Sequence, residues 1–60
     1  MNIHSEKIIA TLKKEKVLTS SEVAKLLKIS WNTADRILTE MLIEEKIQRI
    51  KKEGVTLWLL

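Results

Sequence analysis

Residues 20–39, SSEVAKLLKISWNTADRILT, decide how this chain is expected to fold. Apolar residues recur at helical spacing in both halves of the stretch, with a short interval between them. Thr19, just before it, forms a capping-box pattern with Glu22, in which the hydroxyl and the carboxylate each satisfy a free backbone amide. Ser30 is placed to cap the second half. The stretch therefore predicts helices at about 20–27 and 31–45, joined by a turn of three or four residues.

The remaining segments complete the expected order of elements. Ile8, Ile9 and Leu12 have helical spacing, and Ser5 is placed as an N-cap, which predicts a helix at about 5–15. After residue 46 the apolar residues alternate, which is typical of strands. We expect a β-hairpin over 47–60, with its turn at Lys51–Gly54. Gly54, the only glycine, stands where such a turn needs a positive φ. In this register Val55, Leu57 and Leu59 point inward, whereas Trp58 and Leu60 point outward.

Composition limits the classes of protein that the chain can represent. Its 60 residues make one domain, 1–60, and the absence of cysteine excludes disulfides and thiolate metal sites. The longest apolar run, LWLL, is far shorter than a membrane span, and no signal peptide is evident, so we expect a cytoplasmic protein. We find no nucleophile with a base, no glycine-rich phosphate loop and no cofactor site, so we do not expect an enzyme. The net charge of +3 favours a polyanionic partner.

Three helices followed by a hairpin, with a short turn between the second and third helices, resemble the winged helix-turn-helix family. The family's core positions are occupied by Val23, Ala24, Leu27, Ile29, Ala34 and Ile37, and the likeness covers nearly the whole chain. It implies a mainly α fold with a small β-hairpin, a three-helix bundle plus a two-stranded wing. It also implies the function of small prokaryotic or archaeal transcriptional regulators, which is sequence-selective binding to double-stranded DNA. Lys28 departs from the family, which usually has glycine there. A positive φ would cost lysine roughly 1 kcal/mol relative to glycine.

The resemblance makes the helix at 31–45 the recognition helix in the major groove. It implies base contacts from Asn32, Thr33 and Arg36, whose side chains suit adenine, thymine and guanine edges. The expected contacts to the DNA backbone are Ser20, Ser21, Lys25, Lys28, Trp31, Lys51 and Lys52. Trp31 has two interpretations: its ring packs over the turn between the helices, or its indole N–H reaches a phosphate. Each lysine can equally be a solvated surface charge, and Arg36 can pair with Glu40 one turn later.

Other residues favour a protein partner. Residues 30–45 carry one base and four acids, a net charge of −3, and acids that face phosphates weaken DNA binding. Ile43 lies seven residues after Arg36 and must project from the same outward face. An exposed apolar residue there suggests the alternative function, a protein-interaction winged helix that serves as an adaptor or as a subunit of a larger replication, transcription or division complex.

A homodimer would cover the apolar residues that the predicted hairpin leaves outside. The expected dimer or partner interface consists of Ile3, Ile43, Trp58 and Leu60. In the alternative arrangement, the last strand curls so that Trp58 packs against the first helix. A third hypothesis is that the 60 residues are a domain excised from a longer protein.

Overall fold

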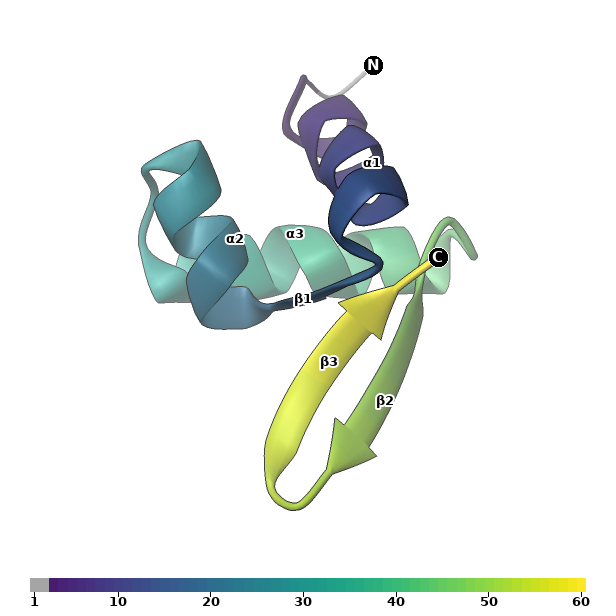
Figure 1. The fold of residues 1–60 in the computed structure, drawn as a ribbon. Coiled ribbons are helices and arrows are strands. Elements are labelled where there is room, and N and C mark those ends of the chain that lie inside the picture. Colours follow the sequence, from purple (N-terminus) through teal and green to yellow (C-terminus); the bar gives the residue numbers. More distant parts are fainter. Residues whose placement is uncertain (1–2) are drawn as a thin grey trace.

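A computed structural model of the chain describes residues 3–60 (Figure 1). The elements, in chain order, are α1 (Ile3–Glu15), β1 (Val17–Thr19), α2 (Ser20–Leu27), α3 (Trp31–Ile43), β2 (Gln48–Lys52) and β3 (Val55–Leu59). Figure 1 shows the three helices gathered together, with the β2–β3 hairpin projecting away from them. The fold is thus mixed, with three helices and a three-stranded antiparallel sheet.

The caps predicted for α2 and α3 are confirmed. The Thr19 N–H donates to Glu22 Oε1 over 2.8 Å, and the Glu22 N–H donates to Thr19 Oγ1 over 3.2 Å. At the start of α3, Ser30 Oγ accepts from the Thr33 N–H over 3.3 Å. These caps satisfy amides that have no partner inside their helices.

Two helix ends differ from the prediction. The first helix begins at Ile3, so Ser5 is a buried residue of α1 and the prediction that it is an N-cap is wrong. The third helix stops at Ile43, two residues earlier than expected, because the chain turns there and Glu45 takes a positive φ of 61°. Helix ends are the features that apolar periodicity locates least well.

The α2–α3 turn keeps a left-handed residue although lysine stands where the resembled family usually has glycine. Lys28 takes φ 57° and ψ 46°, in the left-handed region. Its N–H donates to the Lys25 carbonyl over 3.3 Å, and the Ile29 N–H donates to the Ala24 carbonyl over 3.0 Å. These bonds satisfy the last carbonyls of α2 and hold a non-glycine residue in a strained conformation.

The sheet has one strand more than the two-stranded wing that we expected. Val17–Thr19 form β1, which pairs with β3, and the strand order is β1-β3-β2. Three residues, the last of which is also the N-cap of α2, are too few to show alternation, which is why the sequence did not reveal this strand. The hairpin turn is also tighter than the predicted Lys51–Gly54. Only Glu53 and Gly54 lie between the strands, with φ values of 51° and 80°.

The predicted orientation of the last strand is wrong. Trp58 has no exposed surface, whereas Val55 is 48% exposed and Leu57 and Leu59 are only partly buried. Alternation identifies two sets of side chains but not which set faces the core. Here β1 decides, because Leu18 pairs with Trp58 and both side chains enter the core. The core consists of Ile8, Leu12, Leu18, Val23, Ala24, Ala34, Ile37, Leu38, Met41, Ile47 and Trp58, with Leu27, Ile29 and Leu42 packed against it.

Candidate nucleic-acid interface

The first turns of α3 present three exposed side chains, Trp31, Asn32 and Arg36. The cap at Ser30 fixes where the helix begins and therefore where these side chains point. Thr33 is less available, because its Oγ1 lies 2.9 Å from Ser30 Oγ in a hydrogen bond. Its methyl group remains as a possible contact for a thymine methyl. No ion pair joins Arg36 to Glu40 within residues 3–60, so the guanidinium is not committed to that acid.

Trp31 keeps 52% of its surface exposed. It borders a shallow depression whose other lining comes from the start of α2 and from the hairpin turn, including Ser21, Gly54 and Thr56. The ring therefore borders both the start of α2 and the hairpin. An indole placed there is open to a ligand that contacts both α3 and the hairpin.

A buried hydrogen-bond network holds these same three elements in place. The Trp58 Nε1–H donates to Ser20 Oγ over 2.9 Å, and the Ser20 hydroxyl donates to Asp35 Oδ1 over 3.3 Å. Because Ser20 is only 5% exposed and both of its partners are internal, the prediction that its hydroxyl contacts a phosphate is wrong. The same network draws Asp35 toward α2. Asp35, one of the four acids of residues 30–45, is thereby held against the buried Ser20 instead of pointing freely into solvent.

The basic side chains of the hairpin lie on different faces. Lys51 pairs with Thr56 and Lys52 pairs with Val55, so the two lysines point to opposite sides of the sheet. Lys51 shares the side of Trp58, which is the side of the helices. Arg49 lies on this side too, opposite Trp58, with its guanidinium carbon 5.7 Å from the centre of the indole. Sequence reasoning missed Arg49, because its importance depends on the inward orientation of Trp58.

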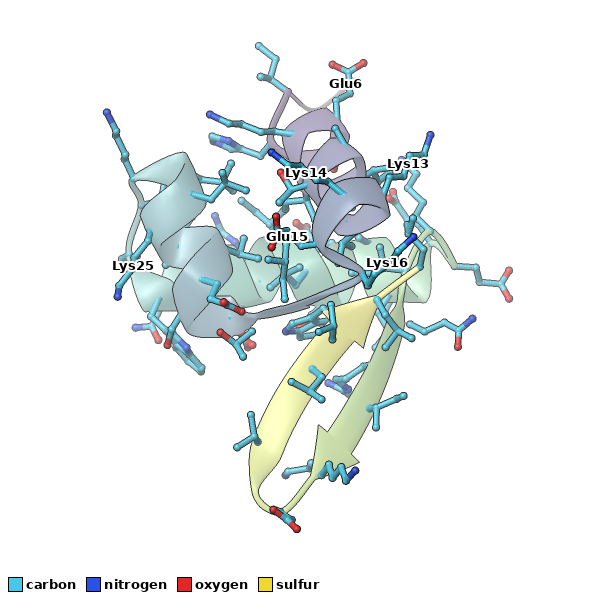
Figure 2. The ribbon with its side chains drawn as sticks, in the orientation of Figure 1. Glu6, Lys13, Lys14, Glu15, Lys16 and Lys25 are labelled. Carbon is cyan, nitrogen blue, oxygen red and sulfur yellow. The ribbon has the colours of Figure 1, made fainter. Side chains whose placement is uncertain are left out.

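The other lysines surround the molecule rather than forming one patch. Figure 2 shows Lys25 projecting from α2 on one side, while Lys13 projects from α1 on the other side and Lys16 lies near the end of β3. Lys25 and Lys28, both exposed, flank the α2–α3 turn. Lys25 and Lys28 thus lie at the end of α2 that leads into α3, while Arg49 and Lys51 lie on the helix side of the hairpin. Lys52, on the outer side of the hairpin, lies apart from them.

The predicted dimer interface is only partly exposed. Ile3 and Ile43 expose 77% and 75% of their surface, and Leu60 exposes 45%. Trp58 is buried, so its assignment to the interface is wrong, because the indole fills the centre of the core instead. The alternative, in which Trp58 packs inward toward the first helix, agrees better with the structure: Trp58 shares the core with Ile8 and Leu12 of α1, and it also bonds to Ser20 of α2 and pairs with Leu18 of β1.

Within residues 3–60, no cluster of three His, Cys, Asp or Glu side chains could hold a metal ion. No helix in the same part of the chain is long and apolar enough to cross a membrane. Comparisons of the chain with protein-family models, with curated proteins and with solved structures gave no match.

Proposed function

We propose that this chain is a winged-helix protein that binds double-stranded DNA sequence-selectively and regulates transcription in the cytoplasm as a homodimer on a two-fold operator. The observation that carries the proposal is the juxtaposition of an exposed, polar helix start with a projecting basic hairpin. The helix start carries Asn32 and Arg36, and the hairpin carries Arg49 and Lys51 on the side of the helices. The element order and the strand order β1-β3-β2 are compatible with a helix-turn-helix followed by a wing.

In this proposal α3 enters the major groove with its N-terminal half. Asn32 and Arg36 read base edges, since amide and guanidinium groups form bidentate pairs with adenine and guanine. Thr33 contributes its methyl group. Ser21, Lys25, Lys28, Trp31 and Lys51 contact the flanking backbone, with Arg49 added and Ser20 removed from the set predicted by sequence. Lys52 adds charge on the outer side of the hairpin.

The role of Arg36 provides the test of sequence selectivity. Preferred sites are first selected from a random duplex library, and binding is then measured by fluorescence anisotropy on single-base variants of the selected site. Arg36→Ala should weaken binding to the preferred site by about 1–3 kcal/mol and relax the preference at one position. Lys13→Ala, an exposed cation that Figure 2 shows away from Lys25, is the control and should keep the full base preference. An equal loss on every sequence would show that Arg36 contacts only the backbone.

The adaptor function is the second candidate, and the exposed Ile43 beside Glu40 and Glu44 favours it. The two candidates predict opposite results from two variants. If the chain binds DNA, reversing the charges of Lys51 and Lys52 abolishes binding to a single-site duplex, whereas Ile43→Glu leaves that binding intact. If the chain is only an adaptor, neither the wild type nor the variants bind the duplex. A protein partner that binds the wild type then fails to bind Ile43→Glu.

A further inference from the structure

An open groove lies between the start of α1 and the end of α3. Ile3, Ile37, Met41 and Ile43 supply its apolar lining. Its polar lining comes from His4 and Ser5 of α1, Glu40 of α3, and Glu44 and Lys46 just after α3. Ile3 and Ile43 are the two most exposed large apolar side chains of residues 3–60. Figure 1 shows the N-terminal end of α1 on the opposite side of the helices from the hairpin turn. The groove thus occupies the end of α3 that the proposed DNA contacts do not use.

The outward stripe of α3 changes chemistry along its length. Arg36, Glu40 and Ile43 follow at intervals of four and three residues and so share one face of the helix. The stripe is basic at the DNA end and acidic and apolar at the groove end. Glu44 pairs with Lys46 over 3.5 Å. Within residues 3–60, no lysine forms an ion pair with Glu40.

The outward stripe of α1 has the complementary chemistry. Ile3, Lys7, Ala10 and Lys14 follow at intervals of four, three and four residues, and all four are exposed. This stripe offers an apolar residue at its start and a cation one turn later. On α3 the order is reversed: the acid Glu40 comes about one turn before the apolar Ile43.

We infer that the groove is the interface of a symmetric homodimer in which α1 of one copy lies antiparallel to α3 of the other. With Ile3 of one copy packed on Ile43 of its partner, the matched spacing brings Lys7 opposite the partner's Glu40. The two-fold axis repeats the same contacts with the copies exchanged, so both grooves are filled. A second copy fits better than an unrelated partner because this chain itself carries a basic stripe that complements Glu40 in the groove.

This interface specifies how the proposed homodimer forms, and it rests on that proposed function. It gives the two ends of α3 different roles. The C-terminal end joins the two copies, while the N-terminal end of each stays free for a half-site. Two exposed isoleucines per copy make a small interface by the standard of stable dimers, so association is expected in the micromolar to millimolar range. A two-site operator would strengthen it by holding both copies at high effective concentration.

Sedimentation equilibrium without DNA, at about 10 μM to 1 mM protein, tests the interface. The wild type should dimerise, and Ile43→Glu should raise the dissociation constant at least about tenfold, because it places a carboxylate in an apolar contact. Ile50→Glu is the matched control, since Ile50 is 48% exposed on the outer face of the sheet, and it should leave the constant unchanged. Equal effects of the two variants, or a wild type that stays monomeric throughout, would overturn the interface.

A charge exchange supplies the second arm. Lys7→Glu and Glu40→Lys should each weaken the dimer, and the double variant should restore it, since the pair reforms with its signs exchanged. A double variant weaker than either single variant would contradict the pairing. Anisotropy on a duplex with one half-site separates this inference from the proposed function. If Ile43→Glu still binds this duplex, the proposed DNA recognition is supported whether or not the protein dimerises. If the wild type dimerises but binds no DNA, the interface is supported and the proposed function is not.

Discussion

At the scale of single residues, the most consequential finding is that Trp58 and Ser20 form part of the core of this small protein. Neither role is visible in the sequence, since alternation cannot tell which face of a strand is buried and a serine after a cap is normally solvated. The indole N–H requires a partner once it is buried, and Ser20 supplies one while donating to Asp35. The two residues lie 38 positions apart, and only the folded chain brings them together.

Replacing the hydroxyl of this network should therefore destabilise the fold. Ser20→Ala leaves the Trp58 N–H without its acceptor and should lower the free energy of unfolding by about 1–3 kcal/mol. Ser21→Ala, the exposed neighbour, is the control, and its effect should stay within about 0.5 kcal/mol. Urea denaturation followed by Trp fluorescence measures both variants. If the two variants prove equally stable, the network contributes nothing.

At the scale of elements, α2, the short turn and α3 were predictable because their signals are local. The capping box at Thr19 and the cap at Ser30 each depend on residues within a few positions, whereas the conformation of Lys28 was left open by the sequence. The third strand and the orientation of β3 were not predictable, because both depend on pairing between Val17–Thr19 and the end of the chain. The candidate site divides in the same way. The sequence identified the exposed residues of α3. It missed Arg49, and it predicted an exposed Ser20 that is in fact buried.

The α2–α3 turn retains a strain that a single substitution should relieve. Lys28→Gly should raise the free energy of unfolding by about 0.5–1 kcal/mol, because glycine adopts a φ of 57° without the steric cost that lysine bears. The same replacement inside α2, Lys25→Gly, should lower it by about 1 kcal/mol. Thermal denaturation by circular dichroism compares the two. A loss of stability in Lys28→Gly would mean that the lysine side chain makes contacts that outweigh the backbone strain.

At the scale of the whole molecule, the distribution of charge matters more than its sum. The net charge of +3 hides an acidic segment, residues 30–45, between two basic ones. The fold separates these charges in space. Asp35 bonds to Ser20, and Glu40 and Glu44 line the groove at the end of α3, while Lys28 lies in the turn before the start of α3. A sequence count could raise the conflict between DNA and protein partners, whereas the arrangement of α1, α3 and the hairpin allows us to propose a separate surface for each.

The most direct test of DNA binding is fluorescence anisotropy of a labelled duplex titrated with the protein at several salt concentrations. Each phosphate neutralised by a lysine or arginine contributes about −0.9 to the slope of log affinity against log salt, so four such contacts predict a slope near −3.6. Binding should weaken at this rate, and a minority of duplex sequences should be preferred. No binding at low salt, or a slope near zero, would contradict the account and leave α3 as a surface for proteins alone.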